Sequence, residues 1–89
     1  MLAVITVTGK DTVGVLAKVS GECADMGANI IDVSQTVMQG LFAMIMMVDI
    51  DALTCDFTEM VDRMEKLGDS MGYVIHVMHE DIFNAMHRI

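Results

Sequence analysis

Basic side chains are scarce in this sequence, and their scarcity limits the possible partners. Five Lys and Arg stand against thirteen Asp and Glu, which gives a formal charge of −8 over 89 residues. Proteins that bind nucleic acids usually hold the phosphate backbone with clustered basic side chains. We therefore expect no nucleic-acid partner.

Cysteine motifs, long hydrophobic runs and a basic leader are missing as well. The two cysteines, Cys23 and Cys55, fit neither a Cys-x-x-Cys redox motif nor a zinc knuckle. The longest apolar run, residues 41–48, is much shorter than the roughly 20 residues of a membrane-spanning helix. No basic segment precedes the apolar residues 2–5, as a secretory signal or transit peptide would require. These absences predict a cytoplasmic protein with reduced thiols and no membrane partner.

Hydrophobic residues, in contrast, are abundant. They make up 54% of the chain, against 20% charged residues, which is too apolar for intrinsic disorder. A chain of 89 residues is enough for one compact domain, so we expect residues 1–89 to fold as a single unit. Because a small domain without disulfides buries limited apolar area, we also expect it to be stabilised by association.

Two hydrophobic periods alternate along the chain. Period-two alternation predicts strands, and apolar residues at helical spacing predict helices. The expected strands are residues 2–8, 29–38, 41–50 and 73–78. The expected helices are residues 13–26, 57–71 and a short terminal helix at 80–89.

The first helix is expected to bury one apolar stripe and to begin at a polar cap. The stripe consists of Val15, Leu16, Val19, Cys23 and Met26. Asp11 or Thr12 can accept a hydrogen bond from the free amides of the first turn.

The second helix carries a capping-box pattern and two ion pairs. Asp56 and Glu59 have the spacing of a capping box. Glu59 with Arg63, and Asp62 with Lys66, are opposite charges four residues apart. Methionines recur on the predicted core stripes, so most of the 11 methionines are expected to fill the core.

The order strand, helix, strand, strand, helix, strand predicts an α+β ferredoxin-like βαββαβ sandwich. Right-handed crossovers place both helices on one face of a four-stranded antiparallel sheet, and a short C-terminal helix follows. The opposite face is expected to be open. Its polar members are Thr6, Asp32, Ser34 and Thr36, and a half-polar face of this kind is a candidate surface for association.

This fold serves several functions, so individual residues must discriminate among them. RNA-recognition modules stack bases on aromatic side chains of the central strands, but the first strand has no aromatic residue and the third has only Phe42. An acylphosphatase-like enzyme needs an arginine in the first strand-to-helix loop, where this chain has only Lys10. Both classes are therefore disfavoured.

Two motifs point to a different class. The segment 8–16 reads Thr-Gly-Lys-Asp-Thr-Val-Gly-Val-Leu, and a Gly-x-Asn-Ile sequence enters the second strand. This pattern resembles the ACT domain, a small-molecule-binding regulatory module, and the likeness covers the whole chain. The matching residues are Asp11, Gly14, Val15, Leu16, Gly27, Asn29 and Ile30.

Residues 32–37 and 79–89 resemble an uncharacterised bacterial and archaeal family of stand-alone ACT proteins. The chain is also similar to the ACT segments of formyltetrahydrofolate deformylase and of the glycine-cleavage regulator. Two positions depart from the family pattern. Val13 stands where the family often has proline, and Gly9 stands where serine-binding relatives have histidine, so serine specificity is not implied.

The resemblance implies a ligand site between two chains, close to the first helix and the second strand. Backbone amides at Thr12, Val13 and Gly14 would lie at the positive end of the first helix and suit a carboxylate, while Asp11 can accept from an ammonium group. Asn29 has one donor and one acceptor function that can orient a ligand. The predicted ligand-binding residues are Asp11, Thr12, Val13, Gly14, Asn29 and Ile30.

A purely structural interpretation of the same residues carries equal weight. Asp11 then caps a helix, Gly14 allows close packing and Asn29 forms a turn.

The second strand is also the expected dimer contact. ACT relatives commonly dimerise side by side, and residues 31–37 contain no proline and a single charge, Asp32, to discourage edge pairing. We expect a homodimer formed through the second strand and the first helix.

Three histidines near the C-terminus suggest a rival hypothesis. His76, His79 and His87, with Glu80 and Asp81, have the side chains of a zinc or nickel site. On a strand, however, residues three apart point to opposite faces, so His76 and His79 converge only if the strand ends between them. The alternative is that these histidines pack and hold the terminal segment. We expect no metal and no other cofactor.

The favoured function is that of a non-enzymatic regulatory module that binds a small metabolite, most simply an amino acid, as a homodimer. No Ser-His-Asp or Cys-His arrangement follows from the spacing, and Cys23 lies on the apolar stripe of the first helix. The alternative is a protein-protein interaction module without a small ligand.

Overall fold

The structure is a computed structural model that describes residues 1–10 and 14–86. The helices and strands follow the order expected from the hydrophobic pattern, and their ends agree with it to within two residues where the structure describes them. They are β1 (Leu2–Gly9), α1 (Val15–Met26), β2 (Asn29–Met38), β3 (Leu41–Asp49), α2 (Phe57–Met71), β4 (Val74–His79) and α3 (Glu80–Met86).

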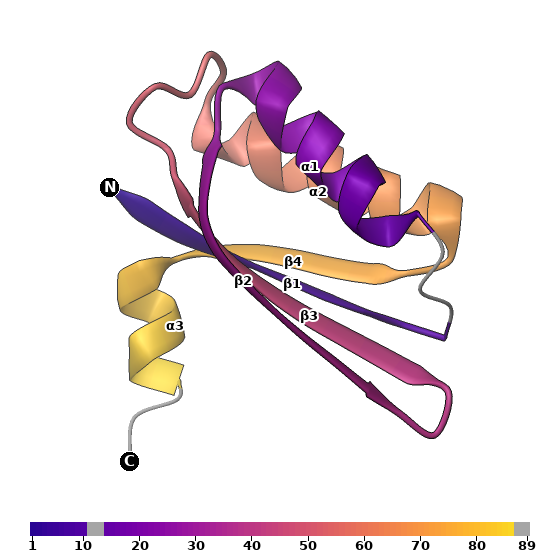
Figure 1. Cartoon of the computed structure of the whole chain (residues 1–89). Helices are drawn as coiled ribbons and strands as arrows, with labels where there is room; N and C mark the ends of the chain where they lie inside the picture. The colour runs from indigo at the N-terminus through magenta and orange to yellow at the C-terminus, as the bar shows by residue number, and fades with distance from the viewer. Residues whose placement is uncertain (11–13, 87–89) are drawn as a thin grey trace.

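The four strands form one antiparallel sheet in the order β2-β3-β1-β4. Helices α1 and α2 cover one face of this sheet (Figure 1). The ferredoxin-like arrangement predicted from the sequence is confirmed. The strand order places β2 and β4 at the two edges, so the expectation that the second strand is an edge strand is confirmed as well.

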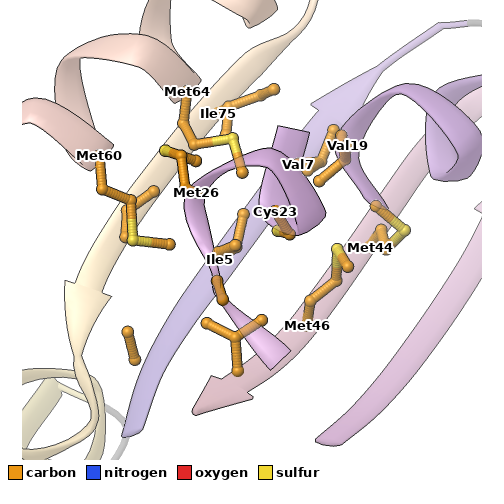
Figure 2. Packing of buried hydrophobic residues seen from close by; sticks show 14 of the residues in the cluster. Ile5, Val7, Val19, Cys23, Met26, Met44, Met46, Met60, Met64 and Ile75 are labelled. Carbon is orange, nitrogen blue, oxygen red and sulfur yellow. The ribbon is translucent and has the colours of Figure 1, made fainter. Parts of the chain in front are cut away.

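The core lies between the sheet and the two long helices. Side chains from β1 and β3 meet methionines from α1 and α2, as Figure 2 shows for Ile5, Met44 and Met60. The methionines that are almost fully buried are Met26, Met44, Met46, Met60 and Met64. The prediction that methionines fill the core is confirmed for these residues. Flexible thioethers pack well here because they adapt to the irregular gap between a twisted sheet and two helices.

The other face of the sheet carries the polar strand residues. In the strand pairing, Thr6 is opposite both Ile45 and His76, and Ser34 is opposite Ile45. Directly opposed residues of an antiparallel pair share a face. The register therefore places Thr6, Asp32, Ser34 and Thr36 on the face away from α1 and α2, as predicted.

One end of this face is not open, contrary to the prediction. Helix α3 lies on the side of the sheet opposite to α1 and α2 and contacts β1 and β4 (Figure 1). Val4 belongs to this face, because it pairs with Met47 and Met78, yet it is only 1% exposed. The terminal helix therefore buries one end of a face that the sequence pattern left uncovered.

Tertiary contacts also replace two of the predicted interactions of α2. Arg63 pairs with Glu22 of α1 instead of Glu59. Its Nε and Nη2 atoms lie 2.9 Å and 2.6 Å from the same carboxylate oxygen of Glu22. Asp56 is the N-cap of α2, but no side-chain hydrogen bond caps this helix, so the predicted capping box is wrong. Asp56 and Glu59 are both exposed, so water can hydrogen-bond to the first-turn amides of α2 in place of a side chain. The predicted pair Lys66 and Asp62 is present at 2.9 Å.

Two apolar residues of α1 and β2 are exposed. Leu16 is 37% exposed, so it lies at the margin of the buried stripe of α1. Ile31 is 52% exposed because the pairing of β2 with β3 shifts by one residue between Ile30 and Asp32. A bulged residue of this kind leaves the regular alternation of a strand.

No helix in residues 1–10 and 14–86 is long and apolar enough to cross a membrane.

Two glycine substitutions test the packing of the helices on the sheet. A Cβ at Gly68 would lie 2.8 Å from the carbonyl oxygen of Tyr73 and 3.0 Å from Cγ1 of Ile75, whereas a Cβ at Gly21 would meet no atom within 4 Å. We predict that Gly68→Ala lowers the free energy of unfolding by about 1–3 kcal/mol, because α2 must move away from β4. The matched variant Gly21→Ala should raise it by about 0.5–1 kcal/mol through helix propensity.

Urea unfolding of both variants at one protein concentration measures these effects. A loss of stability in Gly21→Ala similar to that in Gly68→Ala would contradict this description of the packing.

Candidate functional site

The predicted site begins in the loop between β1 and α1. Asp11, Thr12 and Val13 lie outside the residues that the structure describes. Gly14, the last residue of this loop, is exposed and is the N-cap of α1, with φ 73° and ψ 2°. Residues with a side chain rarely adopt this left-handed conformation, so glycine is required here. Helix α1 therefore begins at Val15, and the predicted start at Val13 is wrong.

The first turn of α1 is suited to an anion. Gly14 has no side chain to cap the helix, and the first turn contains no acidic residue. The amides of Val15, Leu16 and Ala17 have no acceptor within the helix, because an acceptor would have to lie four residues earlier. These amides, together with the helix dipole, favour a negatively charged group at this end.

Tyr73 adjoins the start of the same loop, and the sequence analysis missed it. A Cβ at Gly9 would lie 2.0 Å from Cδ1 and 2.3 Å from Cε1 of Tyr73, so the aromatic ring packs directly on the Gly9 backbone. The Tyr73 amide donates to the Gly68 carbonyl at 2.8 Å, which connects the same residue to the end of α2. The signal in the sequence was Gly9 itself, because a glycine at a strand end often marks a close approach.

Asn29 and Ile30, the remaining predicted site residues, lie at the other end of α1. Gly14 precedes this helix and Asn29 follows it, and 12 helical residues span about 18 Å. Figure 1 shows α1 running back from the end of β1 to the start of β2. Asn29 is exposed, while Ile30 is half-buried opposite Val48. Within one chain, the structure does not bring these two residues together with Gly14.

The free edge of β2 runs between the end of the sheet near Gly14 and the end near Asn29. Most of this strand is exposed, and Asp32 is its single charged residue. Leu16 on α1 is also partly exposed. Unpaired backbone groups along an edge strand invite pairing with another strand, and charged side chains are one of the features that discourage it.

His76 and His79, the two histidines that the structure describes, do not converge on a common site. His76 is exposed on the face away from α1 and α2, whereas His79 pairs with the core residue Ala3 and stacks on Phe57 of α2 with ring centroids 4.0 Å apart. The prediction that His76 and His79 point to opposite faces is confirmed. His87 lies outside the described residues. In the described part of the chain, no group of three or more His, Cys, Asp and Glu residues is placed to hold a metal ion.

Neither cysteine is an activated nucleophile. Burial, with a smaller contribution from the charge of Glu22, raises the pKa of the Cys23 thiol to about 11. Desolvation and the charge of Glu59 also raise the pKa of Cys55. Both thiols are therefore protonated near neutral pH, whereas thiol catalysis requires the thiolate.

A pocket in the described part of the chain lies away from the predicted site. It has a volume of about 460 Å³ and is lined by Met1, Leu2, His79, Glu80, Asp81 and Ile82. This position is at the start of β1, whereas Gly9 is the last residue of β1 and Gly14 follows it. This pocket therefore does not include Gly14, Asn29 or Ile30, the predicted site residues that the structure describes.

Comparison with known proteins identifies the family. The model of the ACT domain family matches residues 1–78. A UPF0237 protein of Listeria innocua is 47% identical over 89 residues and covers 100% of both chains. A UPF0237 protein of Methanococcus maripaludis is 50% identical over 86 residues, which are 97% of this chain and 96% of that protein.

Solved structures agree with this assignment. An ACT domain protein from Streptococcus pneumoniae matches with a TM-score of 0.83 and 41% identity over 98% of each chain. A formyltetrahydrofolate deformylase from Pseudomonas syringae matches with a TM-score of 0.78 and 20% identity, and the match covers 86% of this chain and 26% of the enzyme. The second likeness shows the fold alone.

A family match over most of the chain and relatives of the same length lead to one assignment. The chain belongs to the ACT domain family, whose fold is that of a ligand-binding regulatory module, and within it to the stand-alone UPF0237 proteins of bacteria and archaea.

Proposed function

We propose that this chain is a non-enzymatic regulatory module that binds an amino acid between two copies of itself, paired through β2 and α1. The ligand would contact Asp11, Thr12, Val13 and Gly14 of one subunit and Asn29 and Ile30 of the partner subunit. Binding would stabilise the pair and so bias its interaction with a regulated target.

The separation of Gly14 from Asn29 is the observation that carries this proposal. Gly9 pairs with Phe42, and Phe42 pairs with Val37, so the loop after β1 lies at the same end of the sheet as the end of β2. If two β2 edges pair in antiparallel fashion about their midpoint, the start of one strand lies beside the end of the other. The partner's Asn29 then lies at the end of the sheet that carries Gly14. Two copies thus assemble a site that one chain leaves divided.

The chemistry of this divided site suits an amino acid. The first turn of α1 offers backbone amides to a carboxylate, and its N-cap residue Gly14 has no side chain to bond them. In the sequence, Asp11 supplies a negative charge for an ammonium group. The amide side chain of Asn29 can donate and accept at once, which fixes the orientation of a ligand that has both groups. Gly14 has no side chain, so a ligand can approach the helix closely.

The exposed tip of the β2–β3 hairpin supports the alternative function. Val37, Met38 and Leu41 are 63%, 65% and 54% exposed, and this tip carries no charge. A cluster of exposed apolar residues is typical of protein contacts. In the alternative, the tip binds another protein and no small ligand is involved.

A thermal-shift screen of the wild-type protein against the amino acids tests ligand binding. At about ten times its Kd, a ligand stabilises the native state by about 1.4 kcal/mol, which corresponds to several degrees in Tm for a domain of this size. We predict a shift with at least one amino acid, and loss of that shift in Asp11→Ala and in Asn29→Ala. Absence of a shift with any amino acid would favour the interaction module.

Subunit mixing tests whether the site is shared between two chains. We predict that an equimolar mixture of Asp11→Ala and Asn29→Ala, after subunit exchange, recovers binding. In a mixed dimer, one site contains both substitutions and the other contains neither. Because half of the dimers are mixed at random exchange, calorimetry should find about one quarter of the wild-type sites. No recovery after demonstrated exchange would place the site within one chain.

A charge placed on β2 tests the dimer contact. Gln35 is exposed near the middle of the strand, and two lysines there would face each other across an antiparallel pair. We predict that Gln35→Lys raises the Kd of this contact about tenfold or more, measured by sedimentation equilibrium. Thr58→Lys on α2 makes the same change of charge away from β2 and should have no such effect. Equal behaviour of both variants would exclude β2 as the contact.

A further inference from the structure

Helix α1 carries its charged side chains on the side that adjoins α2. These residues are Lys18, Glu22 and Asp25, and Glu22 forms an ion pair with Arg63 of α2. With about 100° of rotation per residue, all three project from the same side of the buried stripe of α1 that contains Val19. The opposite side of this helix therefore has no charged side chain.

Leu16 is the largest side chain on the uncharged side of α1. It precedes Val19 by three residues, whereas Glu22 follows Val19 by three, so Leu16 and Glu22 project on opposite sides of the buried stripe. Helical side chains lean toward the N-terminus of their helix, so Leu16 covers the first turn, next to Gly14. Because Leu16 is partly exposed, a ligand at the start of α1 can contact it.

Strand β2 continues this uncharged surface at the same end of the sheet. Helix α1 contacts β2 and helix α2 contacts β4, so the side of α1 away from α2 lies toward the edge of β2. Val37 is exposed, and it pairs with the buried residue Phe42, which places it on the helix side of the sheet. Phe42 also pairs with Gly9, which precedes the loop to α1. Leu16 and Val37 therefore lie on one side of the sheet and at one end of it.

Two charged residues near this end were considered as ligand contacts. Asp32, the single charged residue of β2, pairs with Met47 on the other face of the sheet, and its carboxylate accepts a hydrogen bond from the Val33 amide at 2.9 Å. Lys10 is exposed directly after β1, and β1 lies two strand spacings, about 10 Å, from β2. Asp32 is thus on the wrong face, whereas Lys10 would suit an acidic ligand side chain and makes aspartate the critical competitor in the test below.

This surface limits which amino acid the proposed site would bind. A carboxylate held by the first-turn amides of α1 places the rest of the ligand next to Leu16. A charged ligand side chain would lose water against Leu16 and Val37 without gaining a counter-charge there. An apolar side chain would instead remove apolar surface from water. Ile31, beside Asn29, is exposed as well, so the half of the site that the second copy supplies is also apolar.

We infer that the proposed site binds an amino acid with an uncharged, apolar side chain, such as leucine, isoleucine, valine or methionine, and that Leu16 and Val37 select it. This inference rests on the proposed function, because it requires the ligand carboxylate to lie at the start of α1. It adds the class of the ligand and two residues that determine the specificity.

Isothermal titration calorimetry with free amino acids of matched shape tests the ligand class. Valine and threonine have the same shape, and leucine is close in shape to asparagine and aspartate. An apolar pocket typically separates valine from threonine by about 100-fold. We expect valine to bind at least about tenfold tighter than threonine, and leucine at least about tenfold tighter than asparagine or aspartate. Leucine should also give a more negative heat capacity change than alanine, because it buries more apolar surface.

Substitution of Leu16 and Val37 tests the two selecting residues. Leu16→Ala keeps a good helix former and should weaken leucine binding about tenfold. Val37→Thr keeps the β-branched shape, adds a polar group and should weaken it severalfold. Both positions are exposed, so two independent variants are expected to fold. Leu41 is also exposed at this end of the sheet, but it pairs with Met38 on the other face, so Leu41→Ala should bind leucine as the wild type does.

The outcomes separate this inference from the proposed function. If threonine, asparagine or aspartate binds more tightly than its apolar counterpart, and this binding is lost in Asn29→Ala, the proposed function stands and the apolar class is wrong. If leucine binds equally well to the wild type, Leu16→Ala and Val37→Thr, these two residues do not select the ligand and the inference is wrong. Binding of no amino acid to the wild type would contradict the proposed function and the inference together.

Discussion

A chain of 89 residues can cover only one face of its four-stranded sheet with long helices, and the rest of the structure depends on this limit. The core is a single layer between that face and α1 with α2, filled largely by methionines and β-branched side chains. The other face and the edge of β2 remain without comparable cover. The short helix α3 reduces the exposed area at one end. Association is the remaining way for so small a domain to bury apolar surface.

The same limit explains why a ligand site would require two chains. In one chain, Gly14 at the start of α1 and the exposed Asn29 are separated by the length of the helix. In the proposed dimer, a second chain would bring its own Asn29 toward Gly14, because β2 runs along the edge of the sheet from one end to the other. In the proposed dimer, ligand binding and assembly would be coupled through the same strand, so the ligand would regulate assembly.

Much of the fold could be predicted because local periodicity is strong. The alternation of Val33 and Val37 with Ser34 and Thr36 in β2 assigned both faces correctly, although Ile31 did not follow it. A bulge depends on pairing with another strand and leaves little local trace. Arg63 had an acceptable local partner in Glu59 but bonds Glu22, because tertiary packing brings α1 against α2. The position of α3 was also missed, since a seven-residue helix shows no pattern that reveals which face it covers.

The candidate site could be predicted less well than the fold. The motif identified Gly14 and Asn29 but not their separation, which depends on the direction of α1 relative to the sheet. Tyr73 escaped notice because it is distant from Gly9 in sequence and meets it only when β4 pairs with β1. Family resemblance names residues, whereas the distances between them come only from the folded chain.

The methionine-rich core has a consequence for oxidative damage to this protein. Met26, Met44, Met46, Met60 and Met64 come from three different elements and are shielded from solvent in the folded state. Conversion of any one of them to the sulfoxide would introduce a polar oxygen into a layer without polar partners. Oxidants can reach these sulfur atoms only when the helices separate from the sheet. Sulfoxide formation at these five positions therefore records how often this protein opens.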